Sequence, residues 1–207
     1  MSTTANVELD PYTADAENHD LTPQKKIDGL REIIKTTKTA MLTTRAPNGT
    51  LHSRAMTPAS PKHGDHGLHF IFLGNNASHK FNEIENDSNV NVSFYDHSST
   101  DWASVSGIAK VSQDRKLIQD HWSTFVSAYF GDLGDGIHKG DASDPRISVI
   151  EVIPDEIRYW VSTSNSIGKA AHLAYGAITG KGNAPGELRT ITSQEIQLVE
   201  GLHNQTH

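Results

Sequence analysis

The chain has 207 residues, enough for one domain with a sizeable core. Its formal net charge of −7 argues against broad binding to nucleic acid or to an anionic membrane, because both need a basic surface. It contains no cysteine, which excludes disulfides, thiolate nucleophiles and cysteine-ligated zinc.

The first 21 residues are polar and acidic, and we expect them to form a disordered or loosely draped tail. They lack the apolar core of a signal peptide. No apolar run in the sequence approaches the roughly 20 residues that span a bilayer. The sequence therefore predicts a cytoplasmic protein with neither a membrane nor a nucleic-acid partner.

The rest of the chain alternates between apolar-periodic segments and turn signals. Thr22 and Pro23 supply an N-cap and a first-turn proline for the first helix. Strands are expected over 39–45, 51–59, 68–74, 90–95, 102–111, 147–153 and 156–161, and helices over 23–37, 78–85 and 113–130. Gly107, inside a strand, indicates a bulge or a close backbone approach.

This order of elements predicts a mainly β (α+β) fold. Short strands linked by hairpins favour a six- to seven-stranded antiparallel barrel with flanking helices, over residues 22–175. A Rossmann sheet fits poorly, since the sequence has no GxGxxG and no regular βαβ alternation. Residues 176–207 are polar and are expected to be a tail with one weak helical patch at 193–202.

The stretch from 51 to 80 gathers cations and a helix start. Strand alternation places His52, Arg54 and Met56 on one face, so small residues of the other face can pack inside while Arg54 points outward. Ser78 and Lys80 stand at a helix start, where free N–H groups favour an anion. The pattern predicts an anion site; the alternative is an arginine in a surface ion pair and a serine that only caps a helix.

Two other patterns invite a ligand but favour ordinary loops. His63, His66 and His69 are spaced by three, yet the segment is a turn between strands and His69 lies among strand residues, so we expect a solvated loop and no metal. The run from Gly131 to Gly136 lacks the GK[ST] of a P-loop and the final glutamate of an EF-hand, so a connecting loop is expected. Asp101, Asp144 and Arg146 are candidates for surface ion pairs without a functional role.

Four segments occur in a fixed order: SRAMTPAS at 53–60, FIFLGNNASHKFNEIENDSNVNVSFYD at 70–96, DWASVSGIAKV at 101–111 and DPRISVIEVIPDEIRYW at 144–160. Together they resemble the pyridoxamine 5'-phosphate oxidase-like FMN-binding split barrels, in particular the general stress protein branch with its fungal blue-light-inducible proteins. The resemblance implies a split barrel and a homodimer with FMN in clefts at the subunit interface. FAD is also possible, because a cleft open at the phosphate end admits either flavin.

The resemblance also implies which residues hold the cofactor. Arg54 and Lys80, with Ser78 and its neighbouring N–H groups, would hold the phosphate. The remaining candidates line or approach the flavin ring and the phosphate end: Met56, Thr57, Leu73, Gly74, His79, Trp102 (from the other subunit) and Trp160. Gly74 stands where the family often has threonine, and His79 where some relatives carry arginine.

The same resemblance leaves the activity open. The true oxidases carry further arginine and histidine residues near their C-terminus, whereas the segment 161–176 has one lysine and one histidine. Pyridoxamine 5'-phosphate oxidase activity is therefore not expected. A flavin-dependent oxidoreductase of unknown substrate, a non-catalytic flavin store or sensor in stress response and, as a third alternative, a haem-handling split barrel remain.

Overall fold

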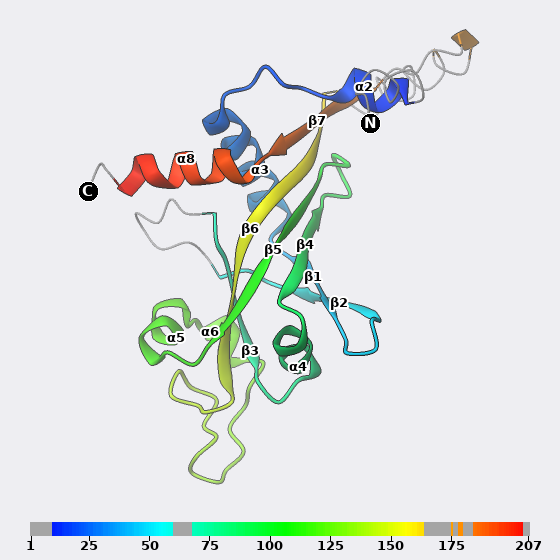
Figure 1. Cartoon of the computed structure of the whole chain (residues 1–207). Coiled ribbons are helices and arrows are strands. Elements are labelled where there is room, and N and C mark those ends of the chain that lie inside the picture. Colours follow the sequence, from blue (N-terminus) through cyan, green and yellow to red (C-terminus); the bar gives the residue numbers. More distant parts are fainter. Residues whose placement is uncertain (1–9, 60–67, 164–174, 176–177, 180–183, 205–207) are drawn as a thin grey trace.

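In the computed structural model, which describes residues 10–59, 68–163, 175, 178–179 and 184–204, the chain forms one antiparallel sheet flanked by helices (Figure 1). The strands are β1 (Ala40–Arg45), β2 (Leu51–Met56), β3 (Phe70–Asn75), β4 (Asn89–Tyr95), β5 (Trp102–Ser112), β6 (Ile147–Ser162) and β7 (Gly186–Ile191). The helices are α2 (Pro11–Ala16), α3 (Pro23–Thr37), α4 (His79–Asn86), α5 (Arg115–His121), α6 (Thr124–Ser127) and α8 (Ser193–Asn204). The expected mainly β fold is confirmed.

The first helix and hairpin form where the local sequence places them. Thr22 caps α3 by accepting a hydrogen bond from the N–H of Lys25, and the apolar face of the helix buries Ile27 and Leu30 completely. Strands β1 and β2 then pair in register through a turn in which Gly49 has a φ of +86°.

The sheet runs in the order β2-β1-β4-β5-β6-β3, with β7 added to β6. Just beyond the end of β2, the N–H of Ala59 donates to the carbonyl of Ile71 in β3 at 2.7 Å. This bond joins the two ends of the strand path. The small barrel that results encloses the main core.

The long strand β6 pairs with β5, β3 and β7. The expected strands 147–153 and 156–161 are therefore one strand of 16 residues. Its register against β5 shifts between Ser106 and Gly107, opposite Pro154. A Cβ on Gly107 would lie 2.3 Å from the carbonyl oxygen of Ile153, so the predicted bulge and close approach are both present.

The segment expected as one helix over 113–130 is divided. Helix α5 ends at His121, Trp122 has extended backbone, and Ser123 caps the short α6 by accepting from the N–H of Val126. The apolar residues of this segment form a second core with the first residues of β6, centred on Ile118 and Ile147.

The chain ends differ from the expected tails over the described residues. Strand β7 extends the sheet and buries Ile191, while α8 buries Ile196 and Val199 against the main core. Helix α2 lies beside β7 in Figure 1, and the N–H of Asn18 donates to the carbonyl of Leu188. The polar composition of the segment gave no sign of this docking, because three well-placed apolar side chains are enough to dock two short elements.

None of the helices in the described part of the chain is both long and apolar enough to cross a membrane.

Candidate functional site: a cation pair between β2 and α4

Arg54 lies on the partly buried face of β2. Leu51, Ser53 and Ala55 are exposed, whereas Arg54 and Met56 are half-buried. The expectation that small residues pack inside and Arg54 points outward is therefore wrong for the single chain. The reason is that α4 covers this face of the hairpin and offers the guanidinium a buried partner.

That partner is Glu83, which is 5% exposed. The Nη2 of Arg54 donates to Oε2 of Glu83 at 2.9 Å, and its Nη1 donates to Oγ1 of Thr44 at 2.6 Å and to the carbonyl of Leu42 at 3.1 Å. Thr44 also donates to Glu83 Oε2, and Nδ1 of His52 lies 2.6 Å from Oε1. Both carboxylate oxygens are thus engaged by β1 and β2.

Burial by itself would raise the pKa of Glu83, as it does for any carboxyl removed from water. The hydrogen bonds from Thr44, His52 and Arg54, with the charge of Arg54, outweigh burial and lower the pKa to about 2. Glu83 is therefore ionised at neutral pH, and its charge is directed at Arg54.

The start of α4 supplies the second cation. Ser78 precedes the helix but makes no side-chain cap bond to it; its hydroxyl donates to the carbonyl of Asn75 at 2.6 Å. The Nζ of Lys80 donates to the same hydroxyl at 2.5 Å. Arg54, Ser78 and Lys80 therefore gather at one place, while the side chain of His79 is exposed.

The surroundings of Lys80 disfavour its charged form. Burial lowers its pKa below 10.5, the nearby charge of Arg54 lowers it further, and Glu83 opposes the shift. Two cations placed together in a partly buried site favour an anion, because a negative ligand relieves both the desolvation and the repulsion. This is the strongest sign of an anion site in the described part of the chain.

Gly74 lies beneath this lysine in β3. A Cβ at Gly74 would meet Cε of Lys80 at 3.1 Å and the ring of Phe81 at 3.3 Å. The threonine that the family often has at this position would therefore need Lys80 to move. Glycine at 74 and the observed position of Lys80 are consistent with each other.

The other cofactor candidates on β2 and β3 lie in different surroundings. Met56 packs against the main core, and Thr57 is exposed just beyond β2. Leu73 packs against the second core. None of these three side chains has a polar contact that ties it to Arg54 or Lys80 among the described residues.

Trp102 and Trp160 form a separate aromatic region. They are opposite each other on β5 and β6 and line a cleft of 400 Å³ together with Tyr12. Tyr12 of α2 stacks on Trp160 with ring centroids 6.1 Å apart and an angle of 9° between planes. Three strand spacings, about 14 Å along the sheet, separate β5 from β2, so one chain does not bring Trp102 to Arg54.

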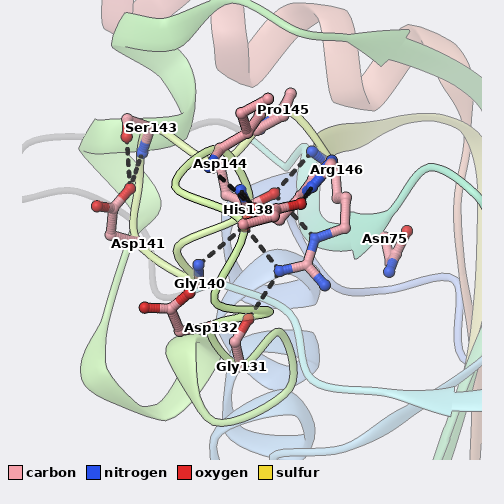
Figure 2. A network of polar contacts seen from close by, with 12 residues as sticks. Asn75, Gly131, Asp132, His138, Gly140, Asp141, Ser143, Asp144, Pro145 and Arg146 are labelled. Carbon is pink, nitrogen blue, oxygen red and sulfur yellow. Dashed lines mark hydrogen bonds and ion pairs between the residues drawn. The ribbon is translucent and has the colours of Figure 1, made fainter.

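A second buried carboxylate–arginine pair belongs to the loop before β6 (Figure 2). Asp144 is fully buried and accepts hydrogen bonds from Nε and Nη2 of Arg146 at 3.0 and 2.7 Å. The Nη2 of Arg146 also donates to the carbonyl of Gly131. The N–H of Gly140 donates to the same carboxylate. The expectation of a surface pair was wrong, because the loop folds over Asp144; the expectation of a connecting loop at 131–136 is confirmed.

The predicted histidine loop falls largely outside the described residues, since 60–67 includes His63 and His66. His69 is described, and its Nδ1 lies 2.7 Å from Oε1 of Glu151. No cluster of three or more histidine, aspartate or glutamate side chains suited to a metal occurs within the described ranges.

Sequence reasoning found Arg54, Ser78 and Lys80 but missed Glu83 and Thr44. A usable signal was present, since Lys80 and Glu83 are three residues apart and share a helix face with the buried Ile84. Tyr12 was missed because it lies in a segment too polar to suggest docking. Its contact with Trp160 depends entirely on the tertiary structure.

Comparison with known proteins matches residues 25–183 to the family model described as "Pyridoxamine 5'-phosphate oxidase like". The chain belongs to the pyridoxamine 5'-phosphate oxidase-like family. The chain is 38% identical to Protein bli-3 of Neurospora crassa over 201 residues, which cover 97% of this chain and 95% of that protein. The predicted family, including its fungal branch, is confirmed.

Two solved structures of low sequence identity share the fold. A protein related to general stress protein 26 from Clostridium acetobutylicum superposes with a TM-score of 0.57 at 15% identity, covering 85% of this chain and 99% of that one. A pyridoxamine 5'-phosphate oxidase-related, FMN binding protein from Nostoc punctiforme gives 0.52 at 13% identity, covering 72% and 95%. The predicted split barrel of six to seven antiparallel strands with flanking helices is thereby confirmed.

Proposed function

We propose that this chain binds FMN and anchors the flavin phosphate between Arg54, Lys80 and Ser78. The observation that carries the proposal is the partly buried Lys80, whose Nζ donates to Oγ of Ser78 at 2.5 Å close to the guanidinium of Arg54. Burial and the charge of Arg54 both lower the pKa of Lys80, which is consistent with a site that favours an anion. A phosphate fits this site, because Lys supplies a point charge and Arg a planar fork of donors. The Nostoc relative described above as an FMN binding protein supports the same cofactor.

The proposed site includes a second subunit. The outer face of β1, β2 and β4 exposes Met41, Leu51 and Tyr95, with exposed fractions of 40%, 62% and 58%. A second copy packed on this face would cover apolar surface and could bring its Trp102 toward the flavin ring. The homodimer, the ring contacts of Met56, Thr57, Leu73, Gly74 and Trp160, and a cytoplasmic location remain predictions.

A bound flavin supplies hydride and single-electron chemistry. The contribution of this chain is to hold the phosphate, exclude water from the anchor and fix the orientation of the cofactor. We therefore propose a flavin-dependent oxidoreductase of the general stress or blue-light-inducible type. A non-catalytic flavin store is the second candidate. It is favoured because Arg54, Lys80 and Ser78, the residues of the proposed anchor, would bind the phosphate and take no part in a reaction.

The test is titration of the purified protein with FMN, FAD and riboflavin, followed by flavin fluorescence. We expect FMN to bind more tightly than riboflavin, which lacks the phosphate. Joint replacement of Arg54 and Lys80 by alanine removes at least two charge-assisted bonds and should weaken FMN by about 3 kcal/mol, roughly 100-fold in Kd. The exposed Lys116, replaced by alanine, is the control and should leave FMN affinity unchanged.

Several outcomes would contradict the proposal. A protein that takes up no flavin refutes flavin binding. Equal affinity for FMN and riboflavin refutes the phosphate anchor, and FAD binding tighter than FMN changes the cofactor. Reduction of bound flavin by NADH or NADPH with turnover supports the oxidoreductase, whereas flavin that neither donor reduces supports the store.

A further inference from the structure

Arg54 has two N–H groups that the described part of the chain leaves open. Both hydrogens of Nη1 are used by Leu42 and Thr44, and one hydrogen of Nη2 is used by Glu83. Of the five N–H groups of an arginine, the Nε hydrogen and the second Nη2 hydrogen are left without an acceptor among the described residues. Nε and Nη2 share one edge of the guanidinium plane, which is the edge that can bind two phosphate oxygens at once.

A negatively charged residue such as Glu83 is unexpected beside a phosphate site, unless its role there is to hold Arg54. Its charge opposes that of the phosphate and would weaken binding if it were free to act over distance. However, both of its oxygens are occupied, one by Thr44 and Arg54 and the other by His52. Because it is only 5% exposed, it cannot exchange these partners for water without the site opening.

The contacts of Glu83 come from two strands. Thr44 from β1 and Arg54 from β2 meet on Oε2, and His52 from β2 meets Oε1. Lys80 is the other charged group on α4 that acts on the pair. The carboxylate therefore fixes Arg54 to the same helix that carries Lys80.

We infer that Glu83 is a positioning residue of the phosphate site, holding the Arg54 guanidinium so that its Nε and remaining Nη2 hydrogens face the flavin phosphate. The inference rests on the proposed FMN binding and deepens it. Glu83 itself touches neither phosphate nor ring. The alternative is an ion pair that only stabilises the contact between α4 and the hairpin.

The two roles differ in one measurable ratio, the affinity for FMN divided by the affinity for riboflavin. Both ligands carry the same ring, so general loss of structure weakens both. Misplacement of Arg54 weakens only the ligand that has a phosphate. The ratio therefore reports positioning separately from stability.

Three variants test the inference. Glu83→Leu removes the acceptor for Arg54 and should lower the ratio about tenfold, the worth of one charge-assisted hydrogen bond. Glu83→Gln keeps an oxygen for Arg54 and Thr44 and an amide hydrogen for His52, so the ratio should stay within about threefold of the parent chain. Thr44→Val removes one support of both groups and should give an intermediate ratio.

The matched control is Glu195→Leu. Glu195 accepts from Nζ of Lys26 at 2.7 Å and is also largely buried, with 20% of its side chain exposed. Its loss should lower stability without changing the ratio. Should Glu83→Leu prove too unstable to titrate, Thr44→Val carries the test: a ratio that falls below that of Glu83→Gln supports positioning, and a ratio equal to that of the parent chain overturns it.

An unchanged ratio in both Glu83→Leu and Thr44→Val, with FMN still preferred by the parent chain, overturns the positioning role and leaves the proposed function intact. A parent chain that does not prefer FMN overturns the proposed anchor first, and the positioning role with it. A fall in the ratio for Glu195→Leu as large as that for Glu83→Leu also overturns the inference, because it would show that any lost ion pair has this effect.

Discussion

The pairs Asp144–Arg146 and Glu83–Arg54 use the same two groups in different ways. Arg146 directs its Nε–Nη2 edge at a carboxylate two residues away, so the donors that could bind an anion are used within the loop (Figure 2). Arg54 reaches a carboxylate on another element through Nη2 and leaves Nε open within the described part of the chain. The first pair closes a loop, whereas the second leaves one edge of its arginine open among the described residues, as the proposed phosphate anchor requires.

Charge balance separates the two places as well. The side chains of Asp144 and Arg146 are 0% and 15% exposed, and hydrogen bonds from Arg146 hold the pKa of Asp144 well below its usual value. At the other pair, Lys80 adds a second cation to one carboxylate. The role that we propose for the Glu83–Arg54 pair therefore depends on the third charge beside it.

The largest effect on stability is expected for the Asp144–Arg146 pair, which is satisfied within its own loop. Asp144→Ala leaves Arg146 and the N–H of Gly140 without their acceptor and should lower the free energy of unfolding by about 4 kcal/mol. Urea unfolding measures the loss. The exposed Asp141, replaced by alanine, should cost under about 1 kcal/mol. If Asp144→Ala changed the ratio of FMN to riboflavin affinity in the folded fraction, the contrast between the two pairs would be lost.

The acid dependence of stability comes next in size. The pKa of Glu83 falls from 4.5 in the unfolded chain to about 2 in the fold, so its contribution is complete above pH 4.5 and is lost as the pH falls toward 2. Glu83→Gln should therefore flatten the decline of urea midpoints across this window. Glu85→Gln, at an exposed site of the same helix, should decline as the parent chain does. Parallel curves for the parent and Glu83→Gln would show that the carboxylate contributes nothing to stability.

The smallest effect concerns Lys80 at alkaline pH. Its pKa is lowered in the free protein, and a bound phosphate favours the charged form. FMN affinity should therefore be constant where Lys80 is protonated and should fall by up to about tenfold as the pH rises through the lowered pKa. Lys80→Arg keeps its charge and should remove this fall. A fall of the same size in Lys80→Arg would assign it to another group.

Much of the fold followed from local patterns. The cap and apolar face at Thr22 to Thr37 predicted α3 with the observed bounds, and Gly107 predicted the bulge in β5. The break between α5 and α6 and the joining of two expected strands into β6 could not be predicted. The first depends on how Trp122 packs, and the second on β5 accommodating Pro154 through the bulge.

By itself the sequence determined the family, through four ordered segments that resemble it. It also predicted the antiparallel fold and singled out Arg54, Ser78 and Lys80, because residue spacing on strands and helix starts fixes which groups can share a face. Only the tertiary structure decided what Arg54 does within the chain. Its partner Glu83 is 29 positions away and lies on another element. Burial turned that carboxylate from an ordinary helix residue into a fixed acceptor, since removal from water makes an ion keep whatever partners the fold provides.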